Sequence, residues 1–573
     1  SPDCVKQRCE LIMNNTYQRW CEDEYFDADT RAELKAIADD PQEIKERFYK
    51  DLEFGTGGLR GILGAGTNRM NIYTVRKATQ GLANFIIKEN AQEKGVAIAF
   101  DSRHMSPEFA KETALCMAAN GIKAYIFPSL RPTPMLSFAL RELGCTAGVV
   151  VTASHNPPQY NGYKVYWEDG AQITAPKDKQ IITEVQAITD FAQVKTMSEE
   201  DAKAAGLYEV IGEEIDDKYM EALKKLVLRP EAIKEQADKL KIVYTPLHGT
   251  DFPTVRYPNP EDKKAFTLAL KLAAEVDADI VLATDPDADR LGIYAKNEKT
   301  GEYESFTGNM SGILILEYLL SQRKELGILP ENGAVVTTIV SGKMAREIAK
   351  AYNVTLIETL TGFKYIGEQI KFFEQDHSHE FLFGYEESYG CLEGTHARDK
   401  DAVVAVMALC EAAAYYKSKG LTLCQQMENL YKTYGYYKEN LISQTFKGME
   451  GKAKIDALME SFRANTPKSV GPFKVLAMED YRSSIRTDIA TGETSELTLP
   501  KSNVLYFELE DKAWVCVRPS GTSLRSNITQ ESKALTRKRP RKKWQLSPQL
   551  SRLWANKFSG RCPAVFCCAA ADF

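Results

Sequence analysis

The sequence predicts an α/β protein built from several domains, and three observations support this fold class. The chain has 573 residues, which at roughly 100–200 residues per domain corresponds to about three to five domains. Short apolar runs alternate with helical segments of about 10–15 residues, the pattern of βαβ units around a parallel sheet. Hydrophobic residues make up 44% of the chain and charged residues 27%, which is ordinary for a globular protein.

Composition also excludes several classes of function. The chain carries 73 Lys and Arg against 79 Asp and Glu, a formal net charge of −6, which argues against a generally basic nucleic-acid binder. It contains no run of about 18 apolar residues, and its first residues lack the apolar centre of a signal peptide, so we expect no contact with a membrane. Twelve cysteines are scattered without metal-ligand spacing, which favours reduced thiols in a cytoplasmic protein.

The elements follow in a regular order along the chain. The first fifty residues are charged and helix-like, with Trp20, Tyr25 and Phe26 as apolar anchors, and a glycine-rich loop covers Asp51–Gly61. The later strands, helices and strand-end loops are expected at residues 95–103, 107–120, 123–127, 146–156, 239–249, 278–290, 333–342, 344–352, 354–364 and 379–388. The helix of 107–120 is expected to end at Gly121. Beyond about residue 471 the strand-like runs favour hairpins instead of βαβ units.

The first loop that carries reactive side chains is Thr152–Pro157, where a hydroxyl and an imidazole are adjacent. A Ser-His-Asp triad is not indicated, because adjacent residues diverge as they leave a strand and no G-x-S-x-G sequence surrounds Ser154. A serine that carries a phosphoryl group fits this loop better. The alternative is a purely structural capping turn before Pro157.

The second loop places three carboxylates at alternate positions, Asp285, Asp287 and Asp289. An extended turn can aim such residues at one point, and hard divalent cations prefer oxygen ligands. Three protein oxygens leave positions open for a phosphate and water, which suits Mg²⁺. The alternative is a solvated acidic turn.

The remaining two loops carry polar groups suited to a phosphorylated sugar. Gly384–Gly390 brings carboxylates and a hydroxyl to a strand end, where they can accept hydrogen bonds from sugar hydroxyls, and a charged cluster follows at Arg398–Asp401. Arg518–Thr522 combines a guanidinium, two hydroxyls and a backbone amide beside glycine, a set that suits a phosphate dianion. Taken singly, each of these loops could also be an ordinary surface turn.

In this order, the four loops resemble those of the α-D-phosphohexomutase family, which contains phosphoglucomutase and phosphomannomutase. The sequence TASHNP resembles the family's phosphoserine loop, DPDADR its magnesium loop, GYEES its sugar loop and RPSGT its phosphate loop. The similarity runs from about Leu52 to Thr522 and is greatest to the long bacterial branch, which eukaryotic phosphopentomutases share. Other matching segments are the Arg60 loop, Asn68–Asn71, Asn161–Trp167, Phe306–Asn309, Thr359–Lys364 and Arg398–Asp401.

The resemblance implies a four-domain phosphohexomutase architecture, with three α/β domains that have mixed sheets and a smaller α+β C-terminal domain around a central cleft. The ranges that it implies are 1–50 for an N-terminal helical extension, 51–210 for domain I, 211–328 for domain II, 329–455 for domain III, 456–525 for an incomplete domain IV and 526–573 for an atypical basic tail.

The resemblance also implies an activity, the reversible interconversion of hexose 1-phosphate and hexose 6-phosphate through a phosphoserine and a hexose 1,6-bisphosphate. It implies Mg²⁺ as cofactor, glucose 1,6-bisphosphate as activator and sugar phosphates as partners of a monomer or weak homodimer. The catalytic residues implied are Ser154, His155, Lys164, Arg60 and Lys400, and the metal ligands are Asp285, Asp287, Asp289 and Ser154. The substrate-binding residues implied are Glu386, Ser388, Thr361, Gly362, Arg290, Arg518, Ser520, Gly521 and Thr522.

Two places depart from the family's pattern. Thr250 runs directly into Asp251, where relatives usually have a couple of dozen further residues, so a helix and a strand of domain II are expected to be missing. From Thr522 to Phe573 there are eleven Lys or Arg and two Asp or Glu, a net charge of +9 in a chain of −6. Because this segment lacks hydrophobic periodicity, we expect that Ser523–Phe573 does not form the closing strand and helix of domain IV.

The sequence is therefore compatible with several functions. The main one is a Mg²⁺-dependent phosphohexomutase, whose preference among glucose, mannose, glucosamine and ribose phosphates is not determined. A phosphopentomutase, a damaged and inactive homologue, and a phosphate-ester hydrolase that uses the same serine and metal are alternatives. A nucleic-acid-binding role for the basic tail is a further, separate possibility.

Overall fold

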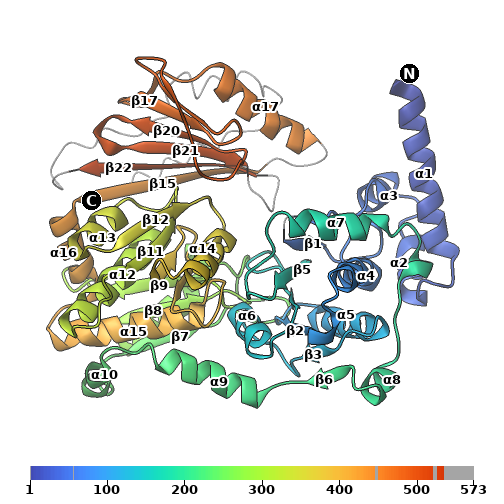
Figure 1. The fold of residues 1–573 in the computed structure, drawn as a ribbon, viewed down its shortest axis with the longest axis horizontal. Helices are drawn as coiled ribbons and strands as arrows, with labels where there is room; N and C mark the ends of the chain where they lie inside the picture. The colour runs from blue at the N-terminus through green and yellow to red at the C-terminus, as the bar shows by residue number, and fades with distance from the viewer. Residues whose placement is uncertain (1, 56, 446–449, 520–524, 535–573) are drawn as a thin grey trace. The chain divides into compact units, whose positions relative to one another are not determined.

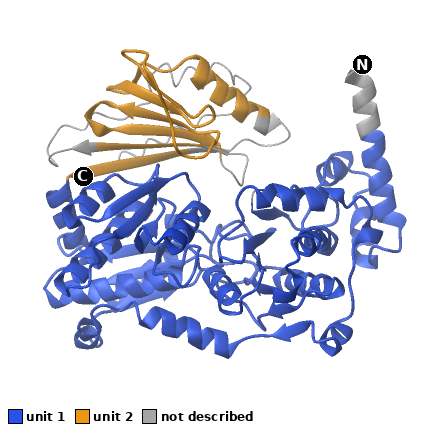
Figure 2. Cartoon of the chain, in the orientation of Figure 1, with its two compact units in different colours: residues 1–434 blue, residues 435–573 orange. Residues whose placement is uncertain are grey.

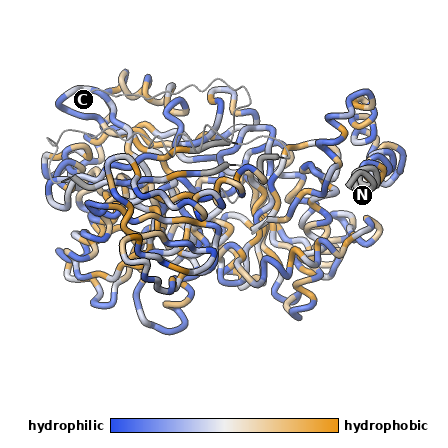
Figure 3. Tube along the Cα trace, turned by 90° about the horizontal axis from the view of Figure 1, so that it is seen from above, coloured by the Kyte–Doolittle hydropathy of each residue, from blue (hydrophilic) through white to orange (hydrophobic). Residues whose placement is uncertain are grey.

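The computed structural model describes residues 2–55, 57–445, 450–519 and 525–534. The chain divides into two compact units, Ser1–Tyr434 and Gly435–Phe573 (Figure 2). Within the described residues no helix combines the length and apolarity needed to cross a membrane. Hydrophobic and hydrophilic segments alternate along the trace (Figure 3), as expected for elements with one buried face.

The chain begins with the predicted helices, α1 (Pro2–Glu22), α2 (Ala28–Lys35) and α3 (Pro41–Phe48). Trp20 and Phe26 are 1% exposed and stack with their ring centroids 4.1 Å apart. Both rings also pack edge-on against Tyr73 of the next helix. The predicted aromatic anchors therefore attach the N-terminal helices to the first sheet domain, while Tyr25 is partly exposed.

The first sheet is mixed and has the strand order β1-β5-β4-β2-β3-β6. β2, β3, β4 and β6 are mutually parallel, and β5 runs antiparallel to both β4 and β1. The strands are β1 (Gly58–Ile62), β2 (Val96–Phe100), β3 (Ala124–Ile126), β4 (Ala147–Val151), β5 (Tyr160–Trp167) and β6 (Tyr208–Val210). The helices of this part are α4 (Ile72–Lys88), α5 (Ser106–Ala119), α6 (Thr133–Glu142), α7 (Lys177–Ala187), α8 (Glu199–Ala204), α9 (Glu213–Lys224) and α10 (Pro230–Gln236).

Alternate residues of β2 face two different hydrophobic clusters. Ile98 packs with residues of α4, α5 and α7, whereas Ala97 and Ala99 pack with residues of α6 and α9. This is why the strands read as continuous apolar runs, since helices cover both faces of the sheet (Figure 1). The second cluster continues into the third domain through Val336 on a strand and Ile366 on a helix, so it connects the first and third domains.

The second sheet has the order β10-β9-β8-β7 and carries the aspartate-rich loop between β8 and β9. Its elements are β7 (Ile242–Thr245), α11 (Thr267–Val276), β8 (Ile280–Thr284), β9 (Leu291–Lys296) and β10 (Tyr303–Phe306). After β7 the chain passes the Thr250–Asp251 junction and reaches a short 3₁₀ turn, Lys263–Phe266, before α11. β7 is an edge strand, and its Ile242 and Tyr244 are 41% and 50% exposed.

The third sheet has the order β12-β11-β13-β14, with β11 parallel to both β12 and β13. Its strands are β11 (Gly333–Thr338), β12 (Thr355–Thr359), β13 (Glu380–Tyr385) and β14 (Cys391–Glu393). Its helices are α12 (Gly308–Glu325), α13 (Met344–Tyr352), α14 (Phe363–Asp376), α15 (Ala402–Ser418) and α16 (Leu423–Tyr434). The predicted βαβ pattern of this region is confirmed.

The C-terminal unit is an antiparallel sheet with one described helix, α17 (Glu450–Ala464). The main strand order is β15-β22-β21-β20-β17-β18-β19, and β16 pairs with β17. The strands are β15 (Tyr436–Thr445), β16 (Ser469–Val470), β17 (Phe473–Asp480), β18 (Ile485–Asp488), β19 (Thr494–Glu496), β20 (Leu505–Leu509), β21 (Trp514–Pro519) and β22 (Arg525–Ala534). The hairpin prediction for this region is confirmed.

The prediction that no closing strand follows Thr522 is wrong. β22 pairs antiparallel with β15 from Arg525 to Ala534 and with β21 on its other edge. Ile528 is buried, and the Trp514 indole donates a hydrogen bond to Glu531 at 3.1 Å. Two neighbouring strands satisfy the backbone of this polar segment, which hydrophobic periodicity alone does not reveal. The predictions for residues 535–573 lie outside the described residues.

Candidate functional site

Ser154 lies in the loop that follows β4 and has a backbone φ of +53°. This left-handed region is uncommon for residues other than glycine and persists where surrounding contacts impose it. The Ser154 backbone N–H donates to the Thr152 hydroxyl at 2.8 Å, and that hydroxyl donates to Asp101 at 2.7 Å. The serine is thus held in a fixed and unusual conformation at the carboxyl end of a buried strand.

The Ser154 hydroxyl donates a hydrogen bond to Asp285 Oδ2 at 2.9 Å and lies 3.2 Å from His155 Nδ1. The carboxylate therefore contacts the serine and not the imidazole, unlike the order of groups in a Ser-His-Asp triad. Burial, followed by the charges of Arg290 and Arg60, holds the pKa of His155 well below its usual value. His155 is accordingly a neutral imidazole beside the serine.

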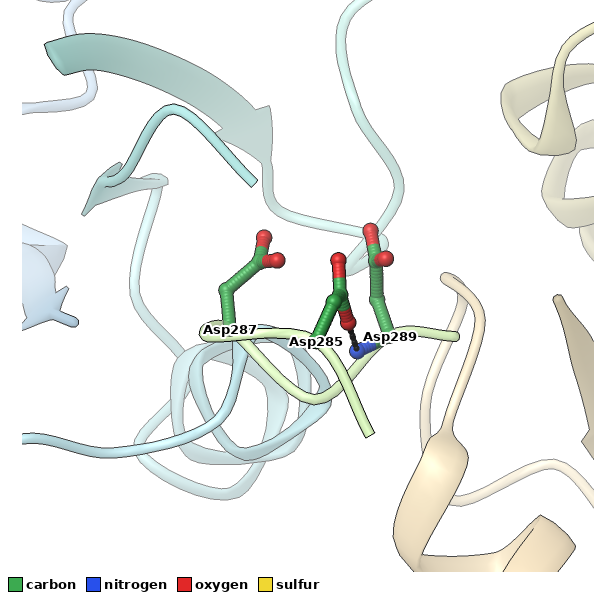
Figure 4. A group of neighbouring side chains, drawn as sticks. All are labelled: Asp285, Asp287 and Asp289. Atoms are coloured by element: carbon green, nitrogen blue, oxygen red, sulfur yellow. Dashed lines mark hydrogen bonds between the residues drawn. The ribbon is translucent and has the colours of Figure 1, made fainter. Parts of the chain in front are cut away.

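Asp285, Asp287 and Asp289 are buried on the loop between β8 and β9, and one oxygen from each lies within 4.8 Å of the others. Figure 4 shows the three side chains rising from the same side of this loop. Asp285 Oδ1 accepts hydrogen bonds from the backbone N–H groups of Asp289 and Arg290, both at 3.1 Å. The turn is therefore closed by one of its own carboxylates.

The aspartate cluster fits a divalent cation. Asp287 Oδ1 and Asp289 Oδ1 are buried and accept no hydrogen bond from the described part of the chain. Burial, together with the neighbouring Asp287 and Asp289, raises the pKa of Asp285 well above its usual value. A bound cation would supply both the missing partners and the missing positive charge, and oxygen-rich sets of this kind favour Mg²⁺ or Ca²⁺.

Two lysines from different parts of the chain approach the aspartate cluster. Lys164 on β5 lies 2.8 Å from Asp287 Oδ2, and Lys400, which precedes α15, lies 3.1 Å from Asp289 Oδ2. Burial is the largest single effect and lowers the pKa of each ammonium, but the neighbouring carboxylates together, led by Asp287 for Lys164 and by Asp289 for Lys400, raise both pKa values. Both lysines are therefore held protonated. The predicted set thus includes cations from the first and third domains around the loop of the second.

Two arginines add positive charge near the serine and the aspartates. Arg290 directly follows the aspartate loop and pairs with Glu261 at 2.7 Å. Arg60 lies on β1 opposite Gly162 of β5. Burial lowers the pKa of Arg60, although the nearby Asp287 carboxylate opposes this shift.

The predicted sugar loop follows β13. Glu386 is 5% exposed, and its Oε1 accepts a hydrogen bond from the Gly362 N–H at 2.9 Å. Burial raises the pKa of Glu386 to about 7, although the Lys400 ammonium opposes this shift. Thr361 has a buried hydroxyl without a hydrogen-bond partner among the described residues, and Ser388 is half-buried. Gly362 has a φ of +125°, a conformation that favours glycine at the start of α14.

The predicted phosphate loop belongs to the C-terminal unit. Arg518 is half-buried on β21, where it is opposite Asn527 of β22. Ser520, Gly521 and Thr522 lie outside the described residues. The structure therefore brings together the predicted residues of the first three domains and leaves those of the phosphate loop untested.

Three supporting residues were missed by the motif analysis. Thr133, at the start of α6, donates its hydroxyl and its backbone N–H to Asp287, both at 2.8 Å. Asp101 and Arg103 follow β2 and contact the serine loop. A signal existed for the last two, because a charged Asp-Ser-Arg turn directly after the apolar run 95–100 lies at the carboxyl edge of the sheet, where ligands are expected.

Comparison with known families gives three matches along the chain. Residues 51–191 match the model described as phosphoglucomutase/phosphomannomutase, alpha/beta/alpha domain I, residues 250–299 match that of domain II and residues 307–434 that of domain III. A phosphoglucomutase of Staphylococcus epidermidis is 38% identical over 511 residues, which are 84% of this chain and 90% of that protein. A phosphoglucomutase of Staphylococcus aureus strain USA300 is 36% identical over 510 residues, 84% of this chain and 89% of that protein.

Solved structures share the fold at lower identity. The chain resembles pp63/parafusin, a phosphoglucomutase of Paramecium in its open form, with a TM-score of 0.63, 17% identity and coverage of 90% of this chain and 97% of that one. A phosphoglucomutase/phosphomannomutase family protein of Burkholderia thailandensis matches with a TM-score of 0.59, 16% identity and coverage of 88% of this chain and 95% of that one. The predicted fold of three α/β domains with mixed sheets and a smaller C-terminal domain is therefore confirmed.

Proposed function

Because the chain belongs to the phosphoglucomutase/phosphomannomutase family, we propose that it interconverts hexose 1-phosphate and hexose 6-phosphate, with glucose phosphates as the first substrates to test. Phosphorylated Ser154 gives its phosphoryl group to the free hydroxyl of the sugar phosphate. The resulting 1,6-bisphosphate reorients within the site and returns its other phosphoryl group to Ser154. Each transfer breaks one O–P bond and forms another, so the protein ends the cycle phosphorylated as it began.

The observation that carries this proposal is the contact between Ser154 and the aspartate cluster. The serine, 3% exposed, has its hydroxyl 2.9 Å from Asp285, in an arrangement unlike a hydrolase triad. A phosphoryl group on this oxygen would lie against Asp285, Asp287 and Asp289. Lys164 and Lys400 already pair with Asp287 and Asp289, so the further negative oxygens of a phosphoryl group would need additional positive charge, which supports a metal-assisted phosphoryl transfer.

We assign the metal site to Asp285, Asp287 and Asp289, with a phosphoryl oxygen on Ser154 as a further ligand, and Mg²⁺ as the ion. A divalent cation held here would neutralise part of the negative charge of the phosphoryl group during transfer. Arg60 and Arg290 contribute fixed positive charge on the same side.

The side chains that handle protons are Lys400, Lys164 and His155. The neighbouring carboxylates, led by Asp289 and Asp287, hold the two lysines protonated. Each lysine is therefore suited to give a proton or hydrogen bond to an oxygen of the sugar or of the leaving group. The neutral His155 is suited to orient the attacking hydroxyl and accept its hydrogen bond. General acid–base assistance of this kind contributes about 10²–10⁴-fold.

Substrate binding divides between two groups of residues. Glu386, Ser388, Thr361 and Gly362 are proposed to bind the sugar hydroxyls, which both isomers present. The set Arg518, Ser520, Gly521 and Thr522 is proposed to bind the phosphate that is not being transferred. Binding one phosphate while the other reacts allows a single site to process both isomers. Glucose 1,6-bisphosphate is the expected activator, because it can rephosphorylate an empty Ser154.

Further parts of the proposal concern organisation and location. We retain the domain ranges 51–210 and 211–328 as proposed boundaries within the first unit, and 329–455 as a proposed range that begins in the first unit and ends in the second. A monomer or weak homodimer stays a prediction. Cys116, Cys145 and Cys391 are free thiols, which supports a cytoplasmic location.

The test is a coupled assay of glucose 6-phosphate formation from glucose 1-phosphate, with and without a trace of glucose 1,6-bisphosphate. Mannose, glucosamine and ribose 1-phosphates in parallel determine the sugar preference, and a higher rate with ribose 1-phosphate would identify a phosphopentomutase instead. Release of inorganic phosphate without glucose 6-phosphate would favour the hydrolase. A folded protein that neither carries phosphate on Ser154 nor turns over any of these sugars would be the inactive homologue.

A further inference from the structure

We infer that Arg103 is a positioning residue that holds Ser154 in its reactive conformation, and that Phe252 in turn holds the Arg103 guanidinium in place. This inference rests on the proposed role of Ser154 as phosphoryl carrier. It assigns a function to the Asp-Ser-Arg turn after β2 and to the segment that directly follows the Thr250–Asp251 junction.

Arg103 organises the serine loop through four backbone carbonyls. Its Nη1 donates to the carbonyls of Pro157 at 2.9 Å and Tyr160 at 3.2 Å. Its Nη2 donates to the carbonyls of Ser154 and Asn156. Arg103 is 1% exposed, so water does not compete for these contacts, although the Pro157 carbonyl also accepts the Tyr160 N–H at 3.1 Å. A planar guanidinium with five donors can connect several carbonyls of one loop, whereas a single ammonium cannot match that fixed fork.

A second contact holds the same loop from the same turn. Asp101 Oδ1 accepts hydrogen bonds from the backbone N–H of Arg103 at 3.0 Å and from the Ser106 hydroxyl at 2.7 Å. Its Oδ2 accepts from Thr152, whose hydroxyl accepts the Ser154 N–H. The carbonyl of Ser154 thus accepts from Arg103, and its N–H donates to the Thr152 hydroxyl that Asp101 holds. Both backbone groups of the serine are constrained, which accounts for its positive φ.

The segment after the second-domain strand β7 completes this arrangement. The ring of Phe252, 2% exposed, lies with its centroid 5.0 Å from the Arg103 guanidinium carbon. Beside it, the Ser102 hydroxyl is 3.2 Å from both the N–H and the carbonyl of Gly249. The guanidinium therefore lies between the serine loop of the first domain and an aromatic ring of the domain that carries the aspartates. A desolvated cation–π contact of this kind stabilises one orientation of the guanidinium.

These contacts predict a specific kinetic effect. Arg103 donates to the protein backbone, and the residues proposed to bind the sugar lie on other loops. Loosening the serine should therefore slow phosphoryl transfer while leaving sugar binding nearly unchanged, since a displacement of about 1 Å in such a reaction can cost about 10²-fold. A residue that only stabilised the fold would instead change the melting temperature and the amount of active protein.

The experiment compares Arg103→Lys and Phe252→Leu with the parent in steady-state turnover of glucose 1-phosphate with glucose 1,6-bisphosphate present. We expect kcat to fall by about 10- to 100-fold in Arg103→Lys and by about 3- to 10-fold in Phe252→Leu, with KM within about 3-fold in both. Single-turnover transfer from the phosphorylated protein should slow by the same factors. His104→Gln is the matched control, because it removes the exposed pair with Asp251 from the same turn and should leave kcat within about 2-fold.

Three outcomes would overturn the inference. The first is a kcat within about 3-fold of the parent in Arg103→Lys. The second is a loss in which KM rises as much as kcat falls. If Arg103→Lys does not fold, an unchanged single-turnover rate in Phe252→Leu overturns it. Ser154→Ala distinguishes failure of the proposed function from failure of the positioning role. Continued turnover in that variant would contradict the proposed function. An inactive Ser154→Ala together with a fully active Arg103→Lys would contradict the positioning role alone.

Discussion

The serine loop and the aspartate loop are built alike but are held in opposite ways. Each follows a buried strand, β4 or β8, and each contains a non-glycine residue with positive φ, Ser154 at +53° and Ala288 at +50°. The aspartate loop is closed mainly from within, because Asp285 accepts the N–H groups of Asp289 and Arg290, although Thr133 also donates to Asp287 from outside. The serine loop is held from outside by Asp101 and Arg103.

The difference follows from the chemistry that each loop carries. A loop rich in carboxylates contains the acceptors that its own N–H groups need. A loop that presents a hydroxyl leaves several carbonyls without donors, and only a buried cation from another segment supplies them. Metal binding should therefore depend mainly on residues 285–290, whereas placement of the serine should depend on residues about fifty positions earlier in the chain.

The largest effect is expected for Ser154→Ala, which removes the phosphoryl carrier but leaves the aspartate loop closed by Asp285. kcat should fall by about 10⁴-fold or more, while affinity for a divalent cation in the absence of phosphate changes little. Turnover and calorimetric titration with Mn²⁺ measure the two quantities. Steady turnover by this variant would show that Ser154 is not the carrier.

The next largest effect separates the two roles within the aspartate loop. Asp287→Asn removes a ligand and should lower kcat by about 10³-fold and abolish the response to Mg²⁺. Asp285→Asn removes a ligand and also disturbs the hydrogen bonds that close the turn, so it should lose at least as much. Mg²⁺ titrations of activity measure this order.

The control for both variants is Asp277→Asn, at an exposed carboxylate before β8 with a φ of +57°, where asparagine is well tolerated. It should behave as the parent. If Asp287→Asn kept a Mg²⁺-dependent rate, the three aspartates would not be the metal site.

A smaller effect is expected for Lys400→Met, which removes the ammonium from Asp289 without touching either loop's backbone contacts. A fall in kcat of about 10²- to 10³-fold is expected from lost proton transfer and charge. Lys417→Met, which removes a pair with Asp279 elsewhere in the same unit, serves as the control. Equal losses in the two variants would indicate a general effect of charge and not a role in the reaction.

The smallest effect concerns pH and the sugar loop. The pKa of Glu386 is raised to about 7 by burial, so its carboxylate is ionised above that pH and neutral below it. If the ionised form accepts the sugar hydroxyls, kcat/KM should fall by roughly tenfold as the pH decreases from about 8 to about 6. Glu386→Gln should have a lower kcat/KM without this component.

The substrate phosphate titrates in the same way in assays of the parent and of Glu386→Gln. The difference between the two pH profiles therefore isolates the contribution of Glu386. Parallel profiles for the parent and Glu386→Gln would show that another group titrates.

The residues that carry the chemistry of each loop could be predicted from the sequence. Ser154, the three aspartates, Glu386 and Lys400 follow strand ends in a recognisable order, and the structure brings them together. The supporting residues were not predicted as site residues, because Thr133 carries no motif and Arg103 is marked only by its place after a strand end. Their importance arises from contacts with Asp287 and with the serine loop, at positions far away in the sequence.

By itself, the sequence determined the order of strands and helices and the chemistry of each loop, since periodicity and turn residues act over a few neighbouring positions. Tertiary structure decided what holds those loops and which polar segments become strands. β22 forms because β15 and β21 satisfy its backbone from both sides, although its own composition suggested otherwise. Arg103 likewise gains its role from Phe252 and the serine loop, because a buried guanidinium is stabilised by partners that only the fold assembles.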